Sequence, residues 1–284
     1  TDSICSAICY ANLKKRLTGE EYEPCRAGNL NPETQFVLKY FKVDAPQLVE
    51  NVRTQVKDIE IRKTKGVNRG ISLKNAWSLM QENNVVTLPC VTDDGLLEGV
   101  ITIGDITKSY MNLYDSSIIS KACTKYANIL DTLDGTMVIG DAESYFDKGK
   151  VLIAAANPDL MENYIEKHDL VILGNRYESQ LCAIEMEASC IIVCEGAGVS
   201  LTIRKLAQER GCTVITTPYD TYTTARLINQ SMPISYFMTT EKIITFSEED
   251  FLDDIREIMA SKRHRDFYAV LVEGISLSGD NISG

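Results

Sequence analysis

One pattern of hydrophobic residues, about sixty residues long, occurs twice in the chain, and a long insertion separates the two copies. In the first copy the pattern predicts a strand, a helix, two strands and a second helix. The pair Asp94-Gly95 between two apolar runs is typical of a β-hairpin turn. Because the pattern restarts near residue 229, we expect two small α/β modules that pack against each other. The expected elements are strands at 57–61, 85–91, 97–101, 243–246 and 267–272, and helices at 72–81, from 104 onward and at 248–259.

The insertion alternates apolar strands with amphipathic helices. Strands are expected at 136–139, 151–155, 170–173, 190–194 and 213–216. This alternation predicts a mainly parallel α/β domain, because parallel neighbours need helical crossovers. Gly196-Ala197-Gly198 follows a strand and opens a helix, which fits either a packing turn or a phosphate-binding loop.

Residues 1–51 are predicted to begin a further α/β domain that lacks its first strand. A helix is expected at 4–15, followed by a strand at 22–26 and a helix that starts at Asn31-Pro32. Because no strand precedes the first helix for it to pack on, we expect a truncated domain. Asp2 stands with Ser3 where a helix cap belongs, and its carboxylate suits either a cap or a hard cation.

Charge and cysteine usage exclude several classes of protein. The 40 acidic residues outnumber the 29 basic ones, for a net charge of -11, so we expect no nucleic-acid partner. No apolar run approaches the length of a membrane span, so we expect no membrane partner. Nine cysteines without a CxxC pair or a signal peptide predict reduced thiols and a cytoplasmic location. The basic cluster at 262–265 is either a solvated loop or a contact for one small phosphorylated ligand.

The chain is therefore predicted to be an α/β protein of four parts. These are an N-terminal αβα part at 1–51, a first module at 52–117, an inserted, mainly parallel α/β domain at 118–228, and a second module at 229–284 whose C-terminal end is incomplete or degraded.

Two segments near the N-terminus, Asp2-Ser3-Ile4-Cys5-Ser6-Ala7 and residues 26–38, resemble the start of the family II inorganic pyrophosphatases of the DHH superfamily. In that family, aspartates and histidines hold a pair of manganese or cobalt ions that act on pyrophosphate. The resemblance implies that Asp2 is a ligand of one Mn²⁺ or Co²⁺ ion. The family's other metal ligands have no counterpart in this sequence. We therefore assign no catalytic residue and expect this polypeptide alone to hydrolyse no pyrophosphate.

The repeated module resembles the CBS domain, on the strength of residues 88–91 and above all of Gly99-Val100-Ile101-Thr102-Ile103-Gly104-Asp105-Ile106. The resemblance implies an adenine-nucleotide site at this corner. Thr102 would face the phosphate and Asp105 the ribose hydroxyls, unless Asp105 simply caps the helix. The implied nucleotide-binding residues are Thr102, Asp105, Arg69 and Cys90, the last two through backbone near the adenine edge, with Arg263 and Arg265 reaching a phosphate between the copies.

The inserted domain is similar to the DRTGG domain, with Gly174-Asn175-Arg176-Tyr177-Glu178 in the place of the motif that names it. The order DHH segment, CBS, DRTGG, CBS resembles that of the nucleotide-regulated, CBS-containing inorganic pyrophosphatases. This implies inhibition by AMP or ADP, activation by ATP or a diadenosine polyphosphate, and a homodimer. Two alternatives stay open, namely a non-catalytic sensor of adenine nucleotides and a module that only dimerises the chain.

Overall fold

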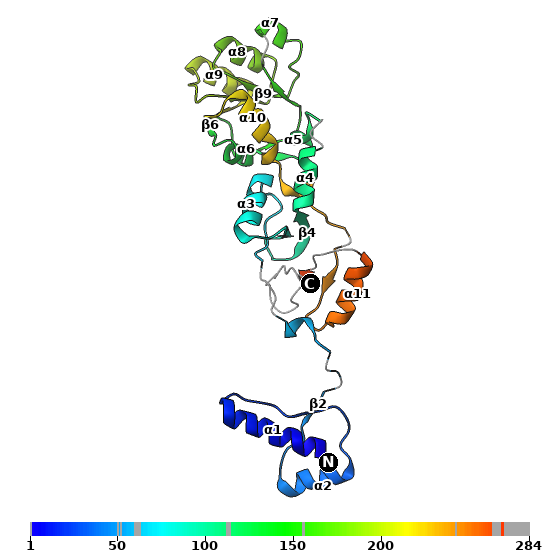
Figure 1. Ribbon diagram of the computed structural model, residues 1–284. Helices are drawn as coiled ribbons and strands as arrows, with labels where there is room; N and C mark the ends of the chain where they lie inside the picture. Colours follow the sequence, from blue (N-terminus) through cyan, green and yellow to red (C-terminus); the bar gives the residue numbers. More distant parts are fainter. Residues whose placement is uncertain are drawn as a thin grey trace. The chain divides into compact units, whose positions relative to one another are not determined.

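The computed structural model of the chain describes residues 2–49, 51, 53–59, 64–111, 115–154, 157–241, 243–262 and 268–269 (Figure 1). The contacts divide the chain into two compact units. The small unit comprises Thr1–Ile59 and Glu249–Lys262, and the large unit comprises Glu60–Glu248 and Arg263–Gly284. The first module and the inserted domain therefore share one unit, whereas the helix of the second copy belongs to the other.

The small unit begins with a helix and a two-stranded parallel sheet. Its elements are α1 (Asp2–Thr18), β1 (Cys25–Arg26), α2 (Pro32–Phe41), β2 (Gln47–Leu48), the 3₁₀ helix η1 (Val56–Asp58) and α11 (Leu252–Lys262). The Asn31 side chain caps α2 by accepting from the amide of Thr34 at 2.7 Å. Asp2 and Ser3 already lie in the first turn of α1, so the prediction that they cap it is wrong. An aspartate is favoured there as well, because the first-turn amides are unpaired and positively polarised.

The strand predicted at 57–61 is wrong for its described part, because Val56–Asp58 forms η1. The Asp58 carboxylate accepts from the amide of Gln55 at 2.9 Å, and the amide of Val56 donates to the carbonyl of Asp250 at 3.0 Å. These bonds give the backbone partners that a strand would otherwise supply. Residues 60 and 61 lie outside the described part of the chain.

The second copy also departs from its expected boundaries, again because of backbone bonds to residues far away in the chain. Its helix α11 starts at Leu252 rather than at 248, since Phe251 bridges Gln55 and the Leu252 amide donates to the carbonyl of Thr54. The strand β12 (Thr245–Phe246) pairs in parallel with β13 (Tyr268–Ala269). Arg263, Arg265 and the corner expected near 279 lie outside the described residues.

The first module of the large unit follows the predicted order of helix, two strands and helix. It contains α3 (Leu73–Asn83), β3 (Thr87–Val91), β4 (Leu97–Thr102) and α4 (Ile103–Met111). Ser72 caps α3 by accepting from the amide of Asn75 at 3.1 Å. The strands β3 and β4 form the expected antiparallel hairpin, and Gly95 takes the left-handed φ of 81° that its turn requires.

The inserted domain is built on a five-stranded sheet with the order β6-β11-β10-β9-β8. Its strands are β6 (Thr136–Ile139), β8 (Val151–Ile153), β9 (Leu170–Leu173), β10 (Cys190–Val193) and β11 (Thr213–Thr216). Neighbouring strands run parallel except β6, which lies antiparallel to β11. The mainly parallel α/β prediction is therefore confirmed. The other elements are α5 (Ile118–Lys121), β5 (Thr124–Lys125), α6 (Tyr126–Thr132), β7 (Tyr145–Phe146), α7 (Pro158–Met161), α8 (Tyr177–Glu185), α9 (Leu201–Arg210), α10 (Thr221–Leu227), η2 (Ile228–Ser231) and η3 (Ile234–Tyr236).

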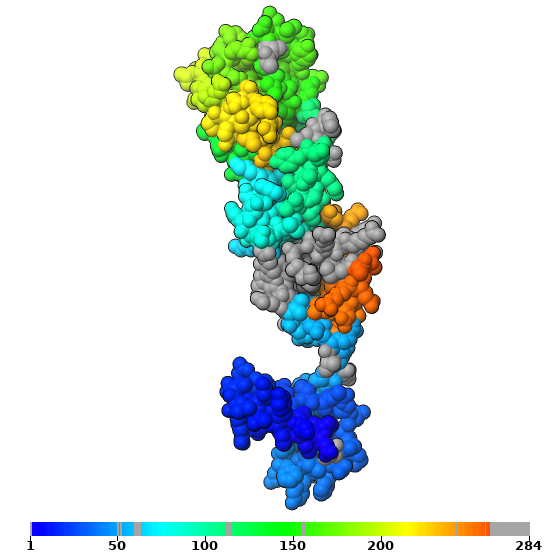
Figure 2. Space-filling view, in the orientation of Figure 1, coloured from blue at the N-terminus to red at the C-terminus, as the bar shows by residue number. Residues whose placement is uncertain are grey.

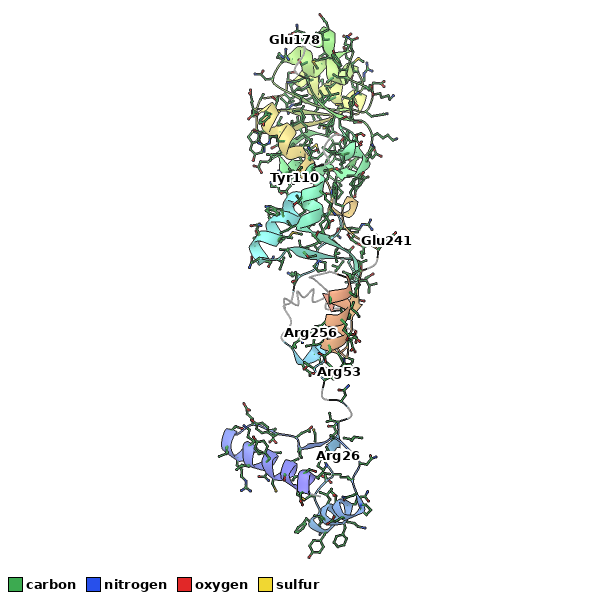
Figure 3. The ribbon with its side chains drawn as sticks, turned by 45° about the vertical axis from the view of Figure 1, so that its right-hand side comes forward. Arg26, Arg53, Tyr110, Glu178, Glu241 and Arg256 are labelled. Atoms are coloured by element: carbon green, nitrogen blue, oxygen red, sulfur yellow. The ribbon has the colours of Figure 1, made fainter. Side chains whose placement is uncertain are left out.

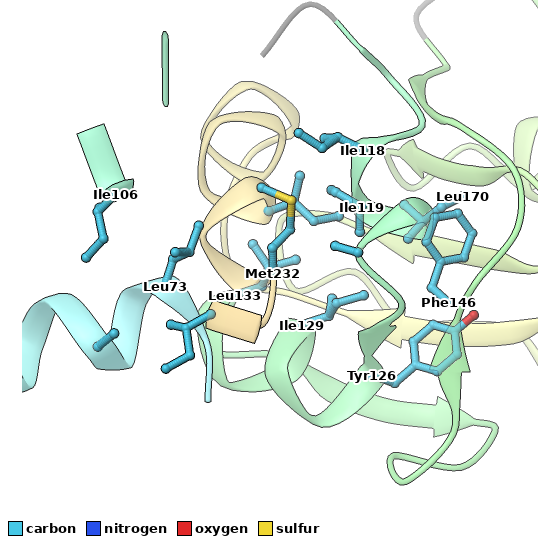
Figure 4. Close-up of a cluster of buried hydrophobic side chains, with 14 of the residues drawn as sticks. Leu73, Ile106, Ile118, Ile119, Tyr126, Ile129, Leu133, Phe146, Leu170 and Met232 are labelled. Carbon is cyan, nitrogen blue, oxygen red and sulfur yellow. The ribbon is translucent and has the colours of Figure 1, made fainter. Parts of the chain in front are cut away.

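One hydrophobic cluster runs from the first module into the inserted domain without a break (Figure 4). Leu73 and Ile106 belong to it from the first module, and Ile129 and Leu133 from α6 and its end. In the space-filling view the surfaces of these two parts of the large unit run into each other (Figure 2). Because they share apolar side chains that would be exposed if they separated, the two parts form one packed body.

Candidate functional site

The predicted site lies where β4 ends and α4 begins. The Asp105 carboxylate accepts from the amide of Thr102 at 3.0 Å and from its hydroxyl at 2.7 Å, and the amide of Asp105 lies 3.2 Å from that hydroxyl oxygen. This is a capping box, so Asp105 does cap the helix. Its second carboxylate oxygen lies 3.9 Å from the Lys108 ammonium, and the side chain is only 15% exposed. Acceptance from ribose hydroxyls stays a prediction.

Arg69 lies on the segment that leads into α3. Its side chain is 55% exposed, and its guanidinium lies 3.2 Å from the Glu98 carboxylate of β4. The carbonyl of Arg69 accepts from the amide of Ser235 at 3.0 Å, and that of Ile71 from the amide of Ile234 at 2.9 Å. The backbone near Arg69 therefore joins the first module to the chain that leaves the inserted domain. A contact between this backbone and adenine stays a prediction, and the exposed guanidinium is a further group that could contact a ligand.

Cys90 is a core residue on β3. Its side chain is fully buried, and burial, with a further contribution from Glu98, raises the pKa of its thiol to about 12. On either side of it, Val67 donates to the carbonyl of Pro89 and accepts from the amide of Val91, both at 2.9 Å. The Cys90 thiol is therefore neutral and has no contact with solvent. A contact between the Cys90 backbone and adenine stays a prediction.

The hairpin register fixes how these residues lie relative to one another. Thr102 pairs with Thr87, whereas Cys90 pairs with Gly99, three residues along each strand. At about 3.3 Å per residue, the group formed by Cys90, Glu98 and Arg69 lies roughly 10 Å from the Thr102–Asp105 corner. The structure thus places Thr102 and Asp105 at one end of the hairpin, and Cys90 and Arg69 beside the other.

A polar pocket beside Arg69 was missed by the sequence reasoning. It has a volume of about 570 Å³, and Asn68, Lys125, Tyr145 and Ser235 are among the residues that line it. The side-chain amide of Asn128, which also lines the pocket, donates to the carbonyl of Gly70 at 3.0 Å and so connects α6 to the segment before α3. These residues come from three widely separated stretches of the chain, near positions 70, 125–145 and 235, so no local pattern could have grouped them.

The Gly196-Ala197-Gly198 segment is a packing turn. The amides of Glu195 and Gly196 donate to the carbonyls of Tyr219 and Thr217 at 2.8 Å, and that of Ala197 to Cys194 at 3.3 Å. Phosphate loops depend on free amides, so the use of these three amides in turn bonds favours the packing turn over a phosphate loop. Helix α9 starts later, at Leu201, with Ser200 as its cap.

Asp2 is exposed at the start of α1. Within the part of the chain that the structure describes, no group of three or more His, Cys, Asp or Glu side chains could hold a metal ion. A manganese or cobalt site needs several such ligands. The described residues therefore do not form a metal site by themselves, and the role of Asp2 as one ligand stays a prediction.

Two further observations bear on the class of protein. All nine cysteines lie within the described ranges, and each is a free thiol. Among the described residues, no helix has both the length and the apolar character that crossing a membrane requires.

Comparison with known proteins identifies both domain types. Residues 56–112 match the CBS domain family, and residues 128–231 match the DRTGG domain family. A cobalt-dependent inorganic pyrophosphatase of Clostridium perfringens is 37% identical over 279 residues, covering 98% of this chain and 51% of that protein. A probable manganese-dependent inorganic pyrophosphatase of Thermotoga maritima is 29% identical over 266 residues, covering 93% of this chain and 48% of that protein. The chain thus spans about half the length of these curated relatives.

A solved structure is similar over most of the chain. It contains the CBS and DRTGG domains of the regulatory region of the Clostridium perfringens pyrophosphatase, in complex with the activator diadenosine tetraphosphate. The TM-score is 0.74 at 34% sequence identity, and the match covers 80% of this chain and 98% of that chain.

Proposed function

Because the chain belongs to the family of metal-dependent inorganic pyrophosphatases that contain CBS and DRTGG domains, we propose that it carries the nucleotide-sensing regulatory region of such an enzyme together with part of its catalytic domain. The observation that carries the proposal is the match to nearly the whole of a regulatory region solved with its activator. The domain boundaries after residues 51, 117 and 228 stay part of this proposal.

The proposed ligands are adenine nucleotides, namely AMP, ADP, ATP or a diadenosine polyphosphate, bound at the first module. The N-terminus of α4 offers a phosphate the Thr102 hydroxyl and the positive end of a nine-residue helix. The Asp105 oxygen that does not bond to Thr102 would accept from a ribose hydroxyl. Arg69, 55% exposed, adds a cation at the other end of the hairpin.

A regulatory ligand acts only through a difference in affinity between two arrangements of the protein. Strand β4 leads into the Thr102 corner, and its Val100 is hydrogen-bonded to Thr239, where the second copy begins. A nucleotide that shifts β4 would therefore shift that contact too. The support for this step is the direct backbone pairing between the two copies. We further propose a homodimer, which light scattering would test.

For catalysis, we propose that residues 2–49 belong to the domain that splits pyrophosphate into two phosphates, with Asp2 as one metal ligand. The described residues offer no complete metal site, so hydrolysis needs groups beyond them. The 284-residue chain with Mn²⁺ or Co²⁺ is expected to release no phosphate from pyrophosphate above a buffer blank. Clear turnover would refute this part of the proposal and leave the nucleotide site untouched.

Calorimetry with AMP, ADP, ATP and diadenosine tetraphosphate tests the sensing role. We expect saturable heat from at least one nucleotide and at least about tenfold weaker binding by Asp105→Ala, since a hydrogen bond to a charged group is lost. Asp220→Ala is the matched control, because Asp220 caps α10 outside the first module. No heat from any nucleotide would favour the alternative in which these domains only dimerise the chain.

A further inference from the structure

A second pocket of the large unit lies where the end of α4 meets α10 and η2. Its volume is about 430 Å³, within the range of small-molecule sites. Tyr110 reaches it from α4, Tyr222 and Arg226 from α10, and Asn229 and Gln230 from η2. Figure 3 shows Tyr110 at the boundary between the first module and the inserted domain. The pocket is distinct from the Thr102–Asp105 corner, which lies at the opposite end of α4.

Two tyrosine rings give the pocket its aromatic character. Tyr222 is 68% exposed and Tyr110 is 43% exposed, so both residues keep surface that a ligand in the pocket can contact. Tyr222 and Arg226 are four residues apart on α10 and therefore share a face. The Arg226 guanidinium carbon lies 5.7 Å from the centre of the Tyr222 ring. Partial burial also raises the pKa of the Tyr110 phenol, as expected in a partly dehydrated pocket.

Arg226 is an available cation. Within the described chain it forms no ion pair with a carboxylate, although the protein carries a net charge of -11. Asp220, on the same helix, is six residues away, about 9 Å along the axis. Its carboxylate is held by the amide and the hydroxyl of Thr223 at 2.9 and 2.8 Å. Asp115, in the adjoining pocket, is already paired with Lys121 at 2.5 Å.

The remaining polar groups are two side-chain amides. Asn229 and Gln230 are half-buried, and neither side chain bonds to another group in the described part of the chain. Amides that are half removed from water favour a ligand that offers donors or acceptors. Among the described residues, the pocket thus combines two partly exposed rings, a guanidinium without a carboxylate partner and two side-chain amides without a hydrogen-bond partner.

We propose that this pocket binds a small planar aromatic anion, with its ring against Tyr110 and Tyr222 and its anionic group at Arg226. Stacking of rings and guanidinium groups on planar ligands, and charge-assisted hydrogen bonds from arginine, are the interactions that suit this ligand. Such a ligand bridges α4 and α10. It would therefore restrict the position of the C-terminal end of α4, whose N-terminal end follows Thr102.

The test uses the fluorescence of 2-aminobenzoate titrated with the 284-residue chain. We expect saturable binding with a dissociation constant of about 1 mM or below. The uncharged analogue 2-aminobenzamide should bind at least about tenfold more weakly, because it lacks the group that meets Arg226. Arg226→Gln should weaken 2-aminobenzoate by a similar factor, whereas Arg256→Gln, on α11, should leave it unchanged (Figure 3).

The ring contribution is tested separately. Tyr222→Phe keeps the ring and should retain binding, whereas Tyr222→Leu should weaken it several-fold. The nucleotide site has its own calorimetric readout, so failure of the nucleotide site and failure of this pocket can be told apart. The proposal is overturned by equal binding of the two analogues, by the absence of saturation up to about 10 mM, or by binding that survives both Arg226→Gln and Tyr222→Leu.

Discussion

Val100 and Thr239 exchange both of their backbone hydrogen bonds, each at 2.9 Å. Val100 lies on β4 of the first module, and Thr239 lies at the start of the second copy. The exchange adds a further backbone partner to the free edge of a two-stranded hairpin, which is marginal by itself. It also brings the chain near Thr239 so close to β4 that the residue beside Val100 has no room for a side chain.

Gly99 is that residue. A Cβ atom there would lie 2.9 Å from the Thr239 carbonyl oxygen and 3.0 Å from the Met238 sulfur. Gly99→Ala is therefore expected to destabilise the large unit by about 1–3 kcal/mol, because the backbone must move. Urea unfolding followed by the fluorescence of Trp77, the single tryptophan, measures this. Gly198→Ala is the control, since a Cβ at 198 meets nothing within 4 Å, and an equal loss in both variants would contradict the argument.

Leu133 tests whether the first module and the inserted domain share one core. It follows α6, is fully buried, and belongs to the same cluster as Leu73 and Ile106. Leu133→Ala is expected to cost about 2–5 kcal/mol. Because Trp77 lies on α3, its fluorescence should report this loss although the substitution is in the other part. Leu160→Ala, which removes a 53% exposed side chain, should change little, and an unmoved Trp77 transition in Leu133→Ala would show separate cores.

Local signals predicted much of the large unit. The Asp94-Gly95 turn, the Ser72 cap and the five apolar strands of the inserted domain are all found where the residue pattern places them. These features depend on interactions within a few positions of one another or on burial of a whole strand. The antiparallel edge strand β6 did not follow from the pattern, because strand direction depends on how the chain returns to the sheet.

Long-range contacts set what the sequence could not predict. Residues 57 and 58 form η1 because Val56 bonds to Asp250, almost two hundred positions away. The backbone near Arg69 is bonded to residues 234 and 235, a pairing that no local pattern in the sequence indicates. At the candidate site, the sequence offered Asp105 either as a helix cap or as a ribose contact; the structure shows the cap, through its bonds to Thr102, and the nucleotide contacts of both residues stay predictions.

Asp169 is a buried carboxylate that holds two loops of the inserted domain. It is 1% exposed and accepts from the amides of Lys150 at 2.9 Å and Glu166 at 2.8 Å. Asp169→Ala would leave both amides without an acceptor, and each unsatisfied donor costs about 1–3 kcal/mol. We expect a fall in thermal stability, measured by circular dichroism, that far exceeds that of the exposed control Asp159→Ala. Asp169→Asn should be intermediate, because its carbonyl oxygen can serve one amide. Equal stability of all three variants would rule out this bracing role.

The buried thiols predict that stability falls at alkaline pH. Burial raises the pKa of Cys90 and of Cys212 to about 12, from an ordinary value of 9.0. Between about pH 9 and pH 12 the unfolded chain therefore loses thiol protons that the folded protein keeps, so the free energy of unfolding decreases as pH rises. Urea unfolding at about pH 7.5 and about pH 10, followed by Trp77 fluorescence, should show this decrease. Cys90→Ala should lessen the difference between the two pH values, whereas Cys123→Ser, at an exposed thiol, should preserve it. A pH dependence that Cys90→Ala leaves intact would mean that other groups cause it.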